Sequence, residues 1–237
     1  MSAPGFPTAR SFTLALAAFF VVVSLGLNGL LRLVSPEPYN QTVLNHTWDT
    51  LRGQSGDDSW GAMIVAIEHL QNKPGVPLYS EIFFTRQFRF QYPPSSLMVL
   101  SAMLLAGPEH VRLSDNHQGP WPTINDVGGW LCLVLMAAAV AAILELRLTG
   151  RLAGDTIQLK WLRAALVVCL TLTFYPAVKA YTLGQIQVLI NALFATAVLG
   201  WLLGWRATSG VLLGLIGLIK PHYGVILLWA ALRKEWG

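Results

Sequence analysis

Residues 11–34 form a predominantly apolar segment close to the start of the chain. A helix needs about 20 such residues to cross the hydrocarbon core of a bilayer, which is about 30 Å thick. A cleaved signal peptide has a shorter apolar region, of about 7–15 residues, followed by small residues at the cleavage site. Here the run is longer, and it ends at Leu31-Arg32-Leu33-Val34 before Ser35 and Pro36. The segment therefore predicts a retained membrane-spanning helix.

The composition favours a membrane protein and argues against a nucleic-acid-binding protein or a zinc protein. Hydrophobic residues make up 54% of the 237 residues and charged residues 12%, against about 25% charged residues in an average soluble domain. The net charge of +4 is not gathered into a basic cluster interleaved with aromatic residues, which argues against nucleic-acid binding. Both cysteines lie in apolar runs, and no Cys/His cluster has zinc spacing. The sequence predicts an all-α integral membrane protein with a single domain over 1–237.

Three further apolar segments have the length of membrane spans: 124–146, 162–181 and 186–205. The loop 147–163 carries Arg147, Arg151, Lys160 and Arg163, and cytoplasmic loops are enriched in basic residues. Arg10 places the N-terminus on the same side. These assignments agree if the loop 35–123 lies wholly outside. The sequence thus predicts a multi-pass protein of the cell inner membrane with a large extracytoplasmic loop.

The outer loop is predicted to hold interfacial helices. From Trp60, the apolar residues Met63, Ile64, Ile67 and Leu70 fall on one helical face. This segment is too short and too polar to span a bilayer, so it is expected to lie on the membrane surface. The run 97–106 is also too short for a crossing. A tilted span that begins near Phe88 is the alternative for this second run.

The last apolar stretch, 210–232, is interrupted at Lys220-Pro221-His222. Proline removes a backbone donor and disfavours helix at the residue before it. Basic residues flank both ends of the stretch, so the positive-inside rule places both ends in the cytoplasm. This pattern predicts a broken or re-entrant helical hairpin with Lys220 near its tip. A single kinked span is the alternative.

Asp57 and Asp58 stand just before the Trp60 helix and are the candidate catalytic residues. Aspartate is favoured there as a helix cap, and helix amides would also keep a carboxylate ionised and fixed in direction. Such a carboxylate suits a general base that takes a proton from an attacking hydroxyl. Plain capping or solvation is the alternative.

Six residues are candidates for substrate binding: Lys220, His222, Gln185, Gln187, Asn191 and Tyr92. An ionisable residue inside a membrane segment is a functional hypothesis by default, so Lys220 is expected to hold an anionic group unless it snorkels to the interface. His222 either donates to a phosphate or is a core histidine. The amide side chains either line a cavity or bond across helices. Tyr92 and the two prolines after it form a stiff turn that could position the outer loop over the cavity.

Four motifs occur in order along the chain: Asp57-Asp58, Phe90-Gln91-Tyr92-Pro93-Pro94, Leu183-Gly184-Gln185-Ile186-Gln187-Val188, and Gly210-Val211-Leu212-Leu213-Gly214-Leu215 running into Ile219-Lys220-Pro221. Together they resemble the GT-C superfamily of integral-membrane glycosyltransferases, and most closely glycosyltransferase family 87, the polyprenol-phosphate-mannose-dependent mannosyltransferases. The resemblance implies a GT-C-like multi-span helical bundle. It also implies Asp58 as the catalytic base, with Asp57 second, and Lys220 at the donor phosphate.

The resemblance further implies the reaction and its partners. A hexosyl group such as mannosyl would pass from a polyprenyl-phosphate-linked sugar to a hydroxyl of a glycan or glycolipid acceptor, in contact with membrane lipid. The cofactor stays open between none and a divalent cation. The resemblance covers only the N-terminal half of the family's length, so a C-terminal half or a partner subunit is expected. The alternatives are a non-catalytic transporter, a lipid-carrier-binding subunit and a structural subunit without a ligand.

Overall fold

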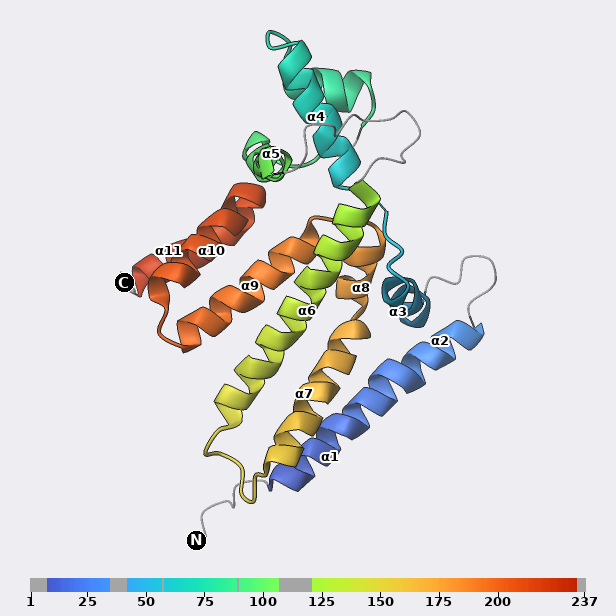
Figure 1. The fold of residues 1–237 in the computed structure, drawn as a ribbon, viewed down its shortest axis with the longest axis vertical. Helices are drawn as coiled ribbons and strands as arrows, with labels where there is room; N and C mark the ends of the chain where they lie inside the picture. The colour runs from blue at the N-terminus through green and yellow to red at the C-terminus, as the bar shows by residue number, and fades with distance from the viewer. Residues whose placement is uncertain (1–7, 35–41, 57, 89, 107–120, 234–237) are drawn as a thin grey trace.

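The structure is a computed structural model that describes residues 8–34, 42–56, 58–88, 90–106 and 121–233. Over these residues the chain forms helices, turns and irregular segments (Figure 1), and no strand beyond a single bridge between Thr8 and Ala153. The prediction of an all-α protein is confirmed for this part of the chain. Asp57 lies outside the described residues.

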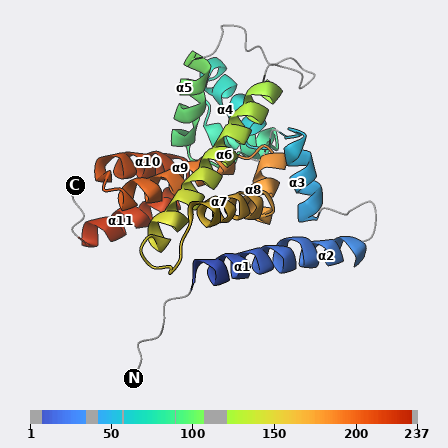
Figure 2. The same cartoon turned by 60° about the horizontal axis from the view of Figure 1, so that its bottom comes forward.

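The N-terminal segment is one long helix at the edge of the molecule. It consists of α1 (Ala9–Phe19), the π-helical η1 (Phe20–Leu27) and α2 (Asn28–Val34). Thr8 caps its start, because its Oγ1 accepts a hydrogen bond from the backbone N–H of Ser11 at 3.1 Å. The helix packs along α7 (Ile157–Leu172), as Figures 1 and 2 show. Its stretch Ala9–Leu30 is long and apolar enough to cross a membrane.

A second helix of membrane length lies in α6 (Trp121–Leu148), over Val127–Leu148. The segment predicted as one span at 162–181 is broken instead, into α7 and α8 (Tyr175–Thr182), which meet at 54°. Pro176 accounts for the break, since proline has no N–H to donate and restricts the residue before it. The described residues therefore hold two helices that can cross a membrane, or three if the bent pair counts as one span.

Helix α9 (Gln187–Leu202) has 16 residues and occupies the middle of the bundle. It begins after Gly184, with φ of 68°, and ends before Gly204, with φ of 83°, a backbone conformation that suits glycine. Sixteen residues rise about 24 Å, so α9 is shorter than the full span predicted at 186–205. It lies between α6 and α10 (Arg206–Ile219) (Figure 1). Six residues of α9 are buried, so the helix packs mainly against protein.

The last apolar stretch bends at Lys220. Helix α10 ends at Ile219, the 3-10 turn η4 covers Pro221–Tyr223, and α11 (Gly224–Leu232) follows. The Tyr223 ring lies 6.0 Å from that of Phe194, and the Trp229 ring lies 5.2 Å from that of Trp201. Helix α11 folds back along α10 and returns toward its start (Figure 1). The stretch is a helical hairpin with Lys220 at its tip; its placement in a membrane stays a prediction.

The described segments between α2 and α6 form an outer layer. It consists of α3 (Val43–Leu51), α4 (Trp60–Asn72), the π-helical η2 (Ser80–Thr85), the 3-10 turn η3 (Pro94–Ser96) and α5 (Leu97–Ala106). Helix α4 has the predicted bounds, but Met63 and Ile67 pack into a protein core with Ile82 and Leu100. Protein therefore covers this part of the apolar face, and the location of α4 at a membrane surface stays a prediction. Among the described residues, the helical structure that leads into α5 reaches back only to Pro94, so no helix extends to Phe88.

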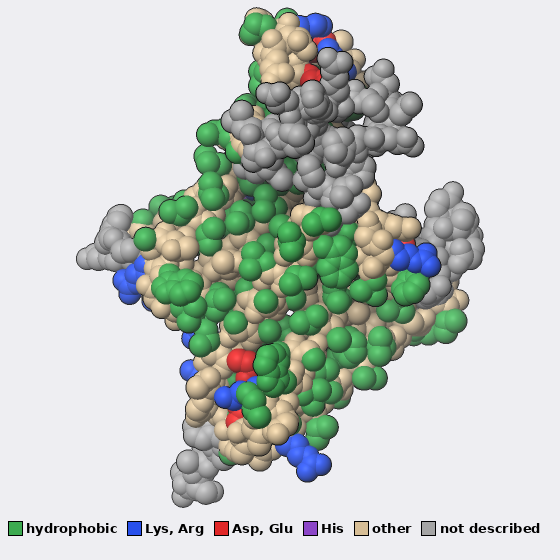
Figure 3. Space-filling model, viewed as in Figure 1, with side chains coloured by type: hydrophobic (Ala, Val, Ile, Leu, Met, Phe, Trp, Pro, Cys, Tyr) green, Lys and Arg blue, Asp and Glu red, His purple; other side chains and the backbone are tan. Residues whose placement is uncertain are grey.

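Hydrophobic side chains spread over the middle of the face in Figure 3, and the coloured Lys and Arg side chains gather near its edges. Many large apolar side chains on α1, η1, α6 and α11 are exposed, among them Phe19, Val22, Leu131 and Leu228. Soluble proteins rarely expose such broad apolar surfaces. Together with the membrane-length helices, this surface identifies the chain as an all-α protein of the membrane type.

Arg163 ties three helices together at the end of the bundle where α6 leads into α7. Its side chain is 0% exposed. Its Nε and Nη2 donate to the two carboxylate oxygens of Glu145 on α6, both at 2.7 Å, and its Nη1 donates to Asp155 at 3.1 Å. Nη1 also reaches Thr13 of α1 at 3.5 Å. The sequence analysis placed Arg163 in the cytoplasmic loop 147–163, but in the structure it is a buried residue of α7.

Removing this guanidinium is expected to destabilise the fold strongly. Arg163→Met leaves two carboxylates without their counter-charge, and breaking a buried ion pair from one side costs about 3–5 kcal/mol. Because Glu145 and Asp155 are partly exposed, the expected loss of stability is about 3 kcal/mol. Denaturation in detergent micelles measures it, with Lys160→Met on the same helix as the control. A loss as small as that of the control would contradict the scaffold role.

A second polar cluster seats α3 on α8 through His46. Lys179 Nζ lies 3.3 Å from His46 Nε2, and Thr182 Oγ1 lies 2.9 Å from His46 Nδ1. An ammonium can only donate, so Nε2 accepts and Nδ1 donates to Thr182. The Tyr175 ring packs edge-on against the imidazole at 5.7 Å. Burial lowers the pKa of His46, the charge of Lys179 lowers it further, and Asp49 opposes them.

The lowered pKa of His46 predicts an acid-sensitive contact. Between the folded pKa and the ordinary value of 6.5, the unfolded chain binds more protons than the folded chain, so stability falls as pH falls through this window. Unfolding measured across pH 5–8 (about the range where histidine titrates) is expected to show this loss in wild type. His46→Gln, which does not titrate, is expected to flatten the curve. An unchanged pH dependence in that variant would refute the assignment.

Candidate functional site

The outer segment 56–59 is held against the turn between α8 and α9 by its backbone. Gly56 N–H donates to the Thr182 carbonyl at 2.9 Å, Asp58 N–H to the Leu183 carbonyl at 3.0 Å, and Ser59 N–H to the Gly184 carbonyl at 3.3 Å. A Cβ at Gly56 would stand 3.0 Å from the Leu183 oxygen. Glycine at this position therefore allows the close approach that places Asp58 beside Gln185.

Ser59 completes this attachment from the inside. It is 1% exposed, and its Oγ accepts a hydrogen bond from the backbone N–H of Ile186 at 3.1 Å. The same Oγ lies 2.7 Å from the hydroxyl of Tyr92. Sequence reasoning missed Ser59, because a serine just before a helix reads as a cap. Its side chain makes no capping bond to α4, and its two partners lie far away in the sequence.

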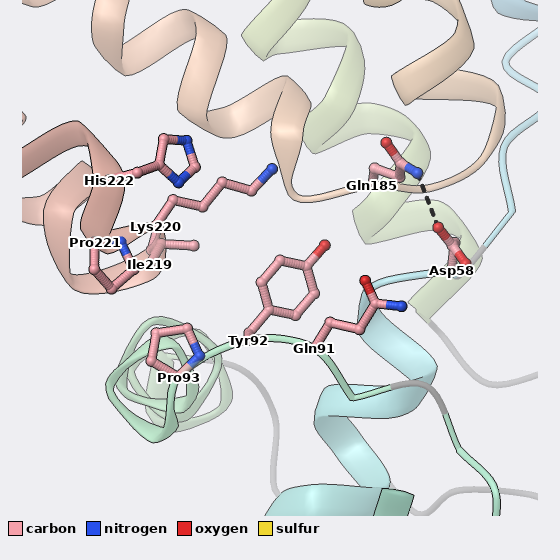
Figure 4. A pocket seen from close by; sticks show the side chains of 9 residues that line it. All are labelled: Asp58, Gln91, Tyr92, Pro93, Gln185, Ile219, Lys220, Pro221 and His222. Atoms are coloured by element: carbon pink, nitrogen blue, oxygen red, sulfur yellow. Dashed lines mark hydrogen bonds between the residues drawn. The ribbon is translucent and has the colours of Figure 1, made fainter.

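Asp58 is held by an amide side chain. Gln185 Nε2 donates to its Oδ2 at 2.9 Å (Figure 4). The predicted fixing of this carboxylate by helix amides is wrong, since its one hydrogen bond to a described residue is to Gln185. The other carboxylate oxygen has no hydrogen bond to a residue that the structure describes. Gln185 therefore holds one oxygen of Asp58, a residue that lines the cavity described below.

Lys220 is also held by an amide. It stands in extended conformation between α10 and η4, with φ of −133°. Its Nζ donates to Gln187 Oε1, and Gln187 Nε2 donates in turn to Asn191 Oδ1 at 2.7 Å. Within the described ranges Lys220 forms no ion pair. Its positive charge is thus oriented by Gln187 and Asn191 without being neutralised.

These groups meet in one cavity of about 430 Å³ (Figure 4). The residues that line it are Asp58, Gln91, Tyr92, Pro93, Gln185, Ile219, Lys220, Pro221 and His222. Five of the predicted site residues therefore share one cavity, although they come from the outer layer, the α8–α9 turn and the hairpin tip. Gln187 and Asn191 do not line it but support Lys220 from behind. Gln91, not among the predicted site residues, lies on the same wall as Tyr92.

The cavity has charged groups of opposite sign on its two sides. Asp58 is the one carboxylate among its lining residues, whereas Lys220 and His222 lie at the hairpin tip. Amides and a phenol stand between them. Within the described residues no group of three His, Cys, Asp or Glu side chains is placed to hold a metal ion. Such a cavity can bind a ligand with an anionic group at one end and hydroxyl groups at the other.

None of the protein-family models, curated proteins and solved structures compared with this chain matches it. The fold and the cavity therefore define the class by themselves. The chain is an all-α protein of the membrane type with a polar cavity at the tip of a helical hairpin.

Proposed function

We propose that the chain is a membrane glycosyltransferase of the GT-C type, or the N-terminal half of one. It would transfer a hexosyl group, such as mannosyl, from a polyprenyl-phosphate-linked sugar to a hydroxyl of a glycan or glycolipid acceptor. The observation that carries the proposal is the meeting of Asp58 and Lys220 in one cavity, each held by a neutral amide. The cell inner membrane, with this cavity on its extracytoplasmic side, is the proposed location.

The chemistry of glycosyl transfer requires both sides of the cavity. An acceptor hydroxyl attacks the anomeric carbon while a base removes its proton, and the sugar passes through a state with oxocarbenium character. The phosphate then leaves with growing negative charge, which a fixed cation stabilises. Asp58 would act as the base, and Lys220, with His222 beside it, would hold the phosphate. A divalent cation or no cofactor remains compatible with these roles.

The first test is whether Lys220 binds the phosphate end of the ligand. Lys220→Gln keeps a polar side chain beside Gln187 but removes the charge. Loss of a charged hydrogen bond is worth about 1.5–3 kcal/mol, so farnesyl phosphate is expected to bind about 10–150-fold more weakly. Binding is measured by calorimetry with purified protein in nanodiscs. Lys160→Gln is the charge-matched control, because Lys160 lies on α7 and does not line the cavity. Equal affinity in the two variants would remove Lys220 from the proposed site.

The second test is transfer. Asp58→Asn preserves an oxygen that can accept from Gln185 but cannot take a proton, so the rate is expected to fall by about 10²–10⁴-fold. Transfer of labelled sugar from a polyprenyl-phosphate donor measures it, with folding checked by thermal unfolding. Glu68→Gln on α4 is the matched control for loss of an outer carboxylate. Full activity in Asp58→Asn would refute the base assignment.

A lipid-carrier-binding subunit or a transporter is the second candidate. It is favoured by the break between α10 and α11, since broken helices are a common form of anion site in transporters. The two tests separate the candidates. Farnesyl phosphate binding without transfer, in the presence of donor and a range of acceptors, would favour the second candidate.

A further inference from the structure

The hydroxyl of Tyr92 projects into the middle of the cavity. Figure 4 shows it in the space between Lys220 and the pair formed by Gln185 and Asp58. Its oxygen lies 2.7 Å from Ser59 Oγ, and either atom could donate in this hydrogen bond. The direction of this bond decides what Tyr92 can offer to a ligand.

The other hydrogen bonds of Ser59 determine the direction of its bond to Tyr92. Its Oγ already accepts from the Ile186 backbone N–H, and a serine hydroxyl has one hydrogen to donate. Ser59 is 1% exposed and has no other acceptor among the residues that the structure describes. If Tyr92 donated to Ser59, the serine hydrogen would be buried without a partner, which is unfavourable. Ser59 therefore donates to the oxygen of Tyr92.

The phenolic hydrogen of Tyr92 is then left for the cavity. The rest of the residue is fixed: its backbone carbonyl accepts from the Tyr79 hydroxyl at 2.8 Å, and its ring packs against Phe90 at 6.4 Å. Burial raises the pKa of Tyr92 above the ordinary phenol value, the Ser59 hydrogen bond opposes this, and the charge of Asp58 raises it further. The hydroxyl keeps its hydrogen at neutral pH.

We propose that Tyr92 donates a hydrogen bond to an anionic oxygen of the bound ligand, and that Ser59 sets this direction by donating to Tyr92. The proposal rests on the proposed function and refines it. In a sugar phosphate that spans the cavity, the acceptor is the phosphate oxygen nearest to the sugar. A hydrogen bond at that oxygen, together with the charge of Lys220, stabilises the negative charge that develops there when the bond to the sugar breaks.

The test compares two variants that remove the same hydrogen bond. Tyr92→Phe removes the donor to the ligand, whereas Ser59→Ala leaves the Tyr92 hydroxyl in place and removes the hydrogen bond that orients it. Farnesyl phosphate affinity is expected to fall about ten-fold or more in Tyr92→Phe and by less in Ser59→Ala. Thermal stability is expected to fall in the opposite order, because Ser59→Ala also leaves the Ile186 N–H without its acceptor. Tyr175→Phe, on α8 beside His46, is the control.

A purely structural tie predicts a different pattern. If the hydroxyl of Tyr92 served only to hold Ser59, affinity would follow stability and Ser59→Ala would be the weaker binder. That result, or equal affinity in both variants, overturns the proposal while wild-type binding keeps the proposed function intact. Absence of farnesyl phosphate binding in the wild type overturns both.

Fluorotyrosine at position 92 tests the direction of the bond directly. Fluorination makes the phenol a stronger donor and a weaker acceptor. Tighter binding of farnesyl phosphate is the expected result, and weaker binding would reverse the assigned direction and overturn the proposal.

Discussion

The cavity depends on the attachment of the segment 56–59 to the turn between α8 and α9. Three backbone hydrogen bonds and the buried hydroxyl of Ser59 hold these two stretches together. This attachment places Asp58 beside Gln185. It also supports Ile186, the residue from which α9 begins, and so the start of the helix that carries Gln187. Both the anionic and the cationic side of the cavity are therefore positioned from one point in the fold.

Charge is used in two different ways in this molecule. At the α6–α7 end, the buried Arg163 is neutralised by Glu145 and Asp155, as a buried charge must be if it is to hold helices together. In the cavity, Asp58 and Lys220 are each held by a glutamine amide. An amide fixes the direction of a charged group without cancelling its charge. The ion pairs of Arg163 suit a scaffold, whereas charged groups held by amides suit a site that binds a charged ligand.

The local features of the chain could be predicted from sequence. The apolar segment 11–34, the helix from Trp60 and the break at Lys220 follow from hydrophobic periodicity and proline chemistry, and the structure has all three. The span predicted at 186–205 is shorter, because the glycines at 184 and 204 confine α9. The apolar face of α4 could be recognised from its spacing, but not what covers it. That cover is a protein core formed with residues much later in the chain.

The sequence by itself determined the helical class, the membrane-type surface and the residue types able to carry chemistry, since each depends on composition or on neighbours within a few turns of chain. Only the tertiary structure decided which of them share a cavity. Ser59 and Ile186, and likewise Asp58 and Gln185, are separated by 127 positions, and no local pattern encodes a hydrogen bond across that distance. The partners of Ser59 and the direction of the Tyr92 hydroxyl arise from packing, because burial removes water as an alternative partner and forces each polar atom to find one in the protein.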